Sequence, residues 1–280
     1  MAPVVMLDMP SLLALFFVVL IGLPHGAFDG AVAVYLGAGR TVSSLLAFCF
    51  GYCLLAAVVV LLWIQFPAAM LIVFLLISAV HFGWGDATST SGAGFAIQVA
   101  VHGALPIFGI AVFHADEVRS LFNLISDGGA APALFLAQLI CWLVAGLLPV
   151  YAVLAWRDPS MRRRFVEGLG LAVTLALLPP LVGFALYFCL FHTARHMAHI
   201  WQNLRTVMPP RQVCWQAAVF TLLSWGAGVL VFIWLDSGDI TADLMRVIFI
   251  GLAALTVPHM ILVDGWFRGS ERKNKHGNEV

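Results

Sequence analysis

Long, continuous apolar segments restrict the fold of this chain more than any other feature of its sequence. Eight such segments occupy residues 10–37, 42–64, 67–85, 92–113, 131–156, 165–203, 213–235 and 242–264. A transmembrane helix needs about 20 apolar residues in a row, whereas a transmembrane strand alternates apolar and polar side chains. The sequence therefore predicts an all-α fold, a polytopic bundle of membrane-spanning helices.

Composition agrees with a membrane protein. Of the 280 residues, 62% are hydrophobic and 10% are charged, whereas soluble domains have about 25% charged residues. Basic residues interleaved with aromatic ones are missing, which argues against a nucleic-acid partner. The five cysteines lie in apolar segments and are typical of small buried side chains rather than of a disulfide framework. We expect one transmembrane catalytic domain over residues 1–266 and a polar, disordered cytoplasmic tail at 267–280.

The segment 165–203 decides how often the chain crosses the membrane. It is too long for one ordinary span, and it contains Pro179-Pro180, where helical hydrogen bonding is interrupted. Basic residues gather on the cytoplasmic side of membrane proteins. If this segment crosses the membrane twice, all basic residues outside the membrane lie on one side except Arg119 and Arg246. If it crosses once, the basic residues divide almost equally between the two sides. We predict about nine spans (eight to ten) in the plasma or inner membrane, with the N-terminus outside and the C-terminus in the cytoplasm.

Histidines inside apolar segments indicate a functional site. Lipid offers no partner to imidazole nitrogens, so each such residue carries a cost. His192 and His196 are one helical turn apart, which lets two imidazoles bind one metal. If the chain crosses the membrane nine times, the helix that carries His192 and His196 runs in the same direction as the helices that carry the other three histidines, so the rings fall at one depth. These other three are His25, His81 and His259. We predict an intramembrane metal site, although any single histidine also fits an interhelical hydrogen bond of about 1 kcal/mol.

An all-imidazole site restricts the metal without fixing it. Iron, copper, zinc and nickel all accept histidine nitrogen. Four neutral histidines leave a divalent iron with two open positions, which suits oxygen activation, whereas zinc is more often closed at four ligands or keeps one water.

Carboxylates accompany three of the histidines. Asp29 follows His25 by four residues, so in a helix it lies on the same face and would orient the ring through its second N–H. Asp86 follows His81 by five residues, and Asp264 stands in the same relation to His259. These two are either similar partners of the rings or markers of the water interface.

Aromatic side chains surround the histidines in the sequence. They pack in an ordinary hydrophobic core or form the wall of an apolar substrate tunnel; the candidates for the tunnel are Trp84, Tyr187 and Phe191. His102 and His114 lie on a helix that runs in the opposite direction, and we expect neither to bind the metal. His199 either joins the metal site or points toward the interface.

Four motifs in order resemble the Brp/Blh family of β-carotene 15,15'-dioxygenases, bacterial and archaeal membrane enzymes that supply retinal to rhodopsins. The motifs are Leu23–Asp29, His81–Asp86, Phe191–His196 and Val257–Met260. The resemblance implies one non-haem ferrous ion, Fe(2+), as the cofactor. The histidines of the first three motifs would hold it: His25, His81, His192 and His196. It implies that O2 cleaves the central double bond of β-carotene into two all-trans-retinal molecules. It leaves His259 a role in the substrate pocket or beside the metal, and it suggests a functional link to a retinal-binding rhodopsin.

Two other functions fit parts of the sequence. A membrane di-iron hydroxylase or desaturase would need about eight histidines in clustered boxes, and this chain has nine histidines but one HxxxH pair. A non-enzymatic haem-binding or ion-translocating bundle would use buried histidine and aspartate as axial ligands or proton relays.

Overall fold

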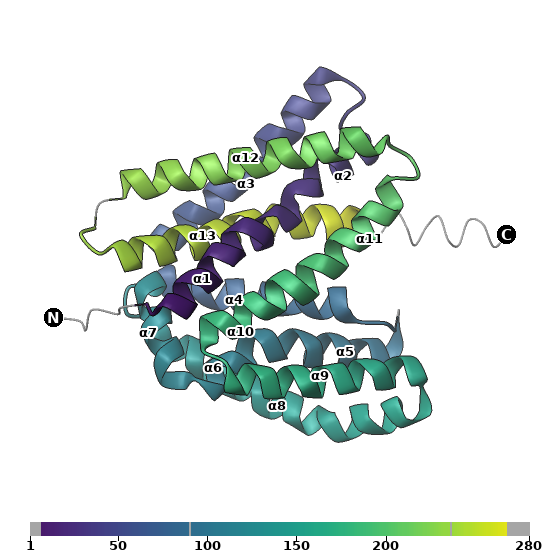
Figure 1. The fold of residues 1–280 in the computed structure, drawn as a ribbon, viewed down its shortest axis with the longest axis vertical. Helices are drawn as coiled ribbons and strands as arrows, with labels where there is room; N and C mark the ends of the chain where they lie inside the picture. Colours follow the sequence, from purple (N-terminus) through teal and green to yellow (C-terminus); the bar gives the residue numbers. More distant parts are fainter. Residues whose placement is uncertain (1–6, 90, 236, 268–280) are drawn as a thin grey trace. The chain divides into compact units, whose positions relative to one another are not determined.

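The computed structural model describes residues 7–89, 91–235 and 237–267, and every regular element among them is helical (Figure 1). Seven of these helices are long and apolar enough to cross a membrane. They cover Met9–Tyr35, Val42–Gln65, Pro67–Asp86, Gly92–Phe113, Ala130–Arg157, Pro210–Trp234 and Ile240–Gly265. The all-α membrane fold is confirmed, whereas the count of about nine spans is not.

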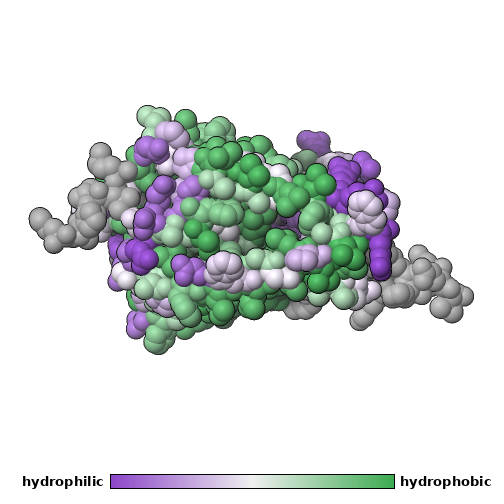
Figure 2. All heavy atoms as spheres, turned by 90° about the horizontal axis from the view of Figure 1, so that it is seen from below, coloured by the Kyte–Doolittle hydropathy of each residue, from purple (hydrophilic) through white to green (hydrophobic). Residues whose placement is uncertain are grey.

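The surface agrees with a protein embedded in a bilayer. The face drawn in Figure 2 is hydrophobic across its middle, and its hydrophilic residues gather toward two opposite ends. Large apolar side chains are exposed on several helices, among them Leu61, Trp142 and Leu230, which are exposed for 62%, 78% and 69% of their surface. Such side chains face water at a cost but face lipid without one, so the chain is membrane-embedded.

The helices form two compact units, the first made of residues 1–18 and 65–192. Its helices are α1 (Met9–Phe17), α4 (Pro67–Asp86), α5 (Gly92–Ala104), α6 (Ile110–Phe113), α7 (Ala115–Ser126), α8 (Ala130–Arg157), α9 (Pro159–Leu177) and α10 (Pro180–Leu186). A π-helical stretch, Tyr187–Thr193, continues α10. The prediction of one catalytic domain over 1–266 stays a prediction, and the predicted tail lies outside the described residues except for Phe267.

Helices α4 and α5 approach each other closely because glycines line their contact. A Cβ atom added to Gly83 of α4 would overlap the carbonyl of Val99, and one added to Gly103 of α5 would overlap the carbonyl of Ala79. Small residues let transmembrane helices pack backbone against backbone. This contact holds the segment of α4 that carries His81.

The predicted interruption of 165–203 is confirmed. Helix α9 ends at Leu177 and α10 begins at Pro180, because Pro179 has an extended backbone (ψ 147°). Proline lacks the N–H that would continue the hydrogen bonding of α9. The chain therefore restarts as a second helix, and this one leads to His192.

The second unit contains residues 19–64 and 193–280. Its helices are α2 (Asp29–Tyr35), α3 (Val42–Gln65), α11 (Ala194–Leu204), α12 (Pro210–Trp234) and α13 (Ile240–Met260), with a π-helical turn at Val18–Gly22, a 3-10 turn at Leu23–Phe28 and a π-helical stretch at Ile261–Phe267. Phe28, Val32, Ile200, Leu204 and Val263 belong to its buried core. Gly30 is needed where α2 meets α12, because a Cβ there would overlap the ring of Phe220.

Candidate metal-binding histidines

The first unit brings together two of the predicted ligands. His81 lies near the end of α4 and His192 in the π-helical stretch Tyr187–Thr193, and their ring centroids are 4.9 Å apart with planes at 69°. Each residue is 1% exposed, and the Nε2 atom of each is fully buried. The pair is thus formed by residues that are far apart in the chain.

Aromatic rings enclose His192. The ring of Phe82 lies 4.4 Å from it, and that of Phe188 stacks at 13° with a centroid distance of 6.0 Å. The ring of Tyr187 lies 6.4 Å away at 30°. These neighbours limit the rotation of the imidazole and keep water from it.

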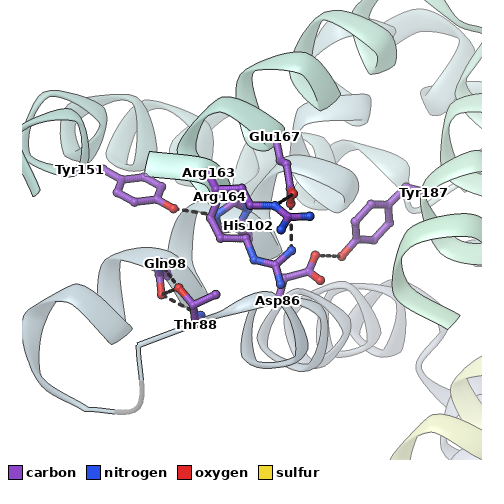
Figure 3. Close-up of polar contacts among 9 residues, drawn as sticks. All are labelled: Asp86, Thr88, Gln98, His102, Tyr151, Arg163, Arg164, Glu167 and Tyr187. Carbon is purple, nitrogen blue, oxygen red and sulfur yellow. Dashed lines mark hydrogen bonds and ion pairs between the residues drawn. The ribbon is translucent and has the colours of Figure 1, made fainter. Parts of the chain in front are cut away.

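Asp86 and Tyr187, both predicted near the site, bond to each other. The Tyr187 hydroxyl donates a 2.9 Å hydrogen bond to Oδ2 of Asp86 (Figure 3). Asp86 is the last residue of α4 and is 3% exposed. Of the other two aromatic candidates, Trp84 lies against Phe95, and Phe191 is 37% exposed.

The second unit also pairs two histidines. His196 of α11 and His259 of α13 have ring centroids 4.9 Å apart, with planes at 61°. One nitrogen of each ring lies within 4.8 Å of the other. The residues are 5% and 1% exposed. His199, one turn further along α11, is exposed, so it does not join the buried pair.

Asp29 connects this pair to two further helices. Nδ1 of His259 lies 2.8 Å from Oδ1 of Asp29, and the Tyr52 hydroxyl donates a 2.8 Å hydrogen bond to Oδ2. The Tyr52 hydroxyl also lies 3.3 Å from the carbonyl of Leu255. Both carboxylate oxygens are therefore engaged. The contact between Asp29 and His25 that the sequence suggested stays a prediction, because the side chain of His25 is outside the described part of the protein.

His25 and Asp264 lie in two stretches of the second unit that are not α-helical. The backbone of His25 lies in the 3-10 turn Leu23–Phe28, and its side chain is outside the described part of the protein. Asp264 lies in the π-helical stretch Ile261–Phe267 and is 7% exposed. Like Asp86, it is a buried carboxylate near the end of a candidate span.

Two histidines have structural hydrogen bonds. Nε2 of His102 lies 2.9 Å from the hydroxyl of Tyr151 (Figure 3), and Nε2 of His114 lies 2.9 Å from the carbonyl of Leu175. These partners satisfy imidazoles inside a helical bundle. The expectation that neither histidine binds the metal stays a prediction.

A small cavity lies beside the second pair. Its volume is about 40 Å³, and His259, Tyr52, Gly26, Trp225 and Thr256 are among the residues that line it.

Tyr52 is the residue that sequence reasoning missed. It lies in the apolar segment 42–64, on α3, and nothing in the spacing connects it with Asp29. A tyrosine buried in an apolar span needs a partner for its hydroxyl, and this was the one available signal.

Comparison with known proteins identifies the family. A family model described as beta-carotene 15,15'-dioxygenase matches residues 16–267. A beta-carotene 15,15'-dioxygenase from uncultured marine bacterium 66A03 is 34% identical over 270 residues, which cover 95% of this chain and 97% of that protein. No solved structure matches the chain. Because the model and the relative both extend over most of its length, the chain belongs to the β-carotene 15,15'-dioxygenase family.

Proposed function

We propose that this protein cleaves β-carotene at its central 15,15' double bond with O2 and releases two molecules of all-trans-retinal. The carbon–carbon double bond breaks and two carbonyl bonds form, so one O2 per β-carotene balances the reaction. Membership of the family carries the proposal. β-Carotene is a hydrocarbon that dissolves in bilayers, and an enzyme within the membrane can accept it laterally.

The proposed cofactor is Fe(II), held by His25, His81, His192 and His196. The chemistry of the donors supports it, since buried, neutral imidazoles are suitable ligands for iron. The pairing of His81 with His192 in one unit and the burial of His196 in the other also support it. Bound iron would activate O2 at its open positions.

The protein's own residues would position the reactants and exclude water. Phe82 and Phe188 lie against the ring of His192, which holds it in one orientation and lowers the local polarity. A fixed ligand geometry at one depth would select the central bond of a long, symmetrical polyene by its distance from the ends.

The proposed location is the plasma or inner membrane, with the N-terminus outside and the C-terminus in the cytoplasm. The distribution of basic residues supports this orientation. A rhodopsin that receives the retinal stays a prediction from the resemblance.

Expression in a β-carotene-producing host tests the function. We expect loss of the orange colour, appearance of retinal, and one iron per chain in the purified protein. Substituting alanine separately for His25, His81, His192 and His196 should abolish cleavage, while His102→Ala keeps it. Two irons per chain would favour a di-iron hydroxylase, and a haem absorbance band without retinal would favour the non-enzymatic bundle.

A further inference from the structure

We infer that His259 is an additional metal ligand and that Asp29 and Tyr52 position it. The inference rests on the proposed iron-dependent function and assigns three residues of the second unit to it. Its basis is the chain of contacts from Tyr52 through Asp29 to His259, and from His259 to the ring of His196.

The contact with Asp29 fixes which nitrogen of His259 can bind a metal. Nδ1 lies 2.8 Å from a carboxylate oxygen that accepts hydrogen bonds, so Nδ1 carries the proton. The lone pair of the neutral ring is then on Nε2, which is fully buried. Metal-bound histidines usually donate their second N–H to a carboxylate in this way.

The position of His196 places a second imidazole beside the first. The ring centroids are 4.9 Å apart, and a nitrogen of one ring lies within 4.8 Å of a nitrogen of the other. Two nitrogens that each lie about 2.1 Å from one ion are separated by up to about 4 Å. A small movement of either side chain would therefore let both bind the same cation.

Tyr52 completes the arrangement from a third helix. Its hydroxyl bonds to the oxygen of Asp29 that His259 does not use, with a distance of 2.8 Å. Asp29 and His259 are 1% and 2% exposed at their side chains, so water does not compete for the carboxylate. With both oxygens engaged, the carboxylate keeps one orientation, and so does the imidazole that it holds.

Iron retention in two variants, each measured beside a matched control variant, tests the inference. His259→Ala is compared with His102→Ala, because each removes a buried histidine that bonds to a side chain of another helix. Tyr52→Phe is compared with Tyr151→Phe, because both remove a hydroxyl bonded to a buried side chain. The measurements are iron per chain after dialysis, the melting temperature of the iron-free protein, and the absorption spectrum of the Co(II)-loaded protein.

We expect His259→Ala to bind iron at least 10-fold more weakly and to change the Co(II) spectrum, while His102→Ala keeps both. We expect Tyr52→Phe to weaken iron binding about 10-fold, whereas Tyr151→Phe lowers only the melting temperature. If His259→Ala fails to fold, His259→Gln, which keeps a donor for Asp29, is measured instead. Wild-type iron binding and spectrum in the folded His259 variant would overturn the ligand role, and unchanged binding in Tyr52→Phe would overturn the positioning role.

The outcome separates this inference from the proposed function. If His81→Ala and His192→Ala lose iron while the His259 variant retains it, only the assignment of His259 fails. If the wild-type protein neither binds iron nor forms retinal, the proposed function fails as well.

Discussion

Tyr187 donates a 2.9 Å hydrogen bond to Asp86, and its ring lies 6.4 Å from that of His192 at an angle of 30°. The tyrosine thus connects the end of α4 with the helical stretch that carries a proposed iron ligand. Its hydroxyl is held by a carboxylate that is 3% exposed, so the bond fixes the tyrosine ring beside the imidazole.

Replacing Tyr187 with phenylalanine should impair cleavage more than stability. The variant loses one hydrogen bond between helices, worth about 1 kcal/mol, and frees the ring that limits the motion of His192. We expect a small decrease in melting temperature and about a 10-fold or larger loss of retinal formation, because small displacements of reacting groups are costly. Tyr151→Phe serves as the control, since it removes a buried hydroxyl of the same unit. Equal losses of activity in both variants would make the Tyr187 bond purely structural.

Glycine at 83 should be required for the fold around His81. A methyl group at Gly83 would meet the carbonyl of Val99, and helix contacts of this kind cannot widen without losing their packing. Gly83→Ala should destabilise the protein by about 1–3 kcal/mol, the range for overpacked cores. Gly146→Ala on α8 is the control, because a Cβ there meets nothing within 4 Å. The comparison requires only melting temperatures in detergent, and equal values for the two variants would show that α4 and α5 can separate without cost.

The sequence predicted the helical class and the break at Pro179-Pro180, because apolar length and proline act locally. It also predicted that His81 and His192 belong to one site. It did not point to His259 and Tyr52 as partners of Asp29, because both lie far from Asp29 in the chain. The predicted contact between Asp29 and His25 stays a prediction. The hydrogen bond from Tyr52 depends on the packing of α3 and α2, which no local pattern encodes.

Whether residues 159–204 cross the membrane once or twice can be measured directly. Two crossings place Arg163 and Val207 on the same side of the membrane, whereas one crossing places them on opposite sides. The side chain of Arg163 is 84% exposed and Val207 is 58% exposed, so a cysteine at either position is reachable. In a variant without the exposed Cys53 and Cys214, we expect a membrane-impermeant maleimide to label both sites in inverted vesicles and neither in intact cells. Labelling of one site in intact cells would rule out two crossings.

Acid should weaken the start of α9 through Asp158. The side chain of Asp158 accepts hydrogen bonds of 2.8 Å from the hydroxyl and from the backbone N–H of Ser160, and these bonds lower the pKa of its carboxyl. Because the folded state holds the charged form, the contribution to stability is complete above the ordinary pKa of about 4 and is lost as the pH falls through the lowered value. Asp158→Ala should therefore melt at a lower temperature than the wild type at pH 7, and the difference should shrink below pH 4. A difference for Asp158→Ala that stays constant from pH 7 to pH 3 would mean that the charge of this N-cap does not stabilise the helix.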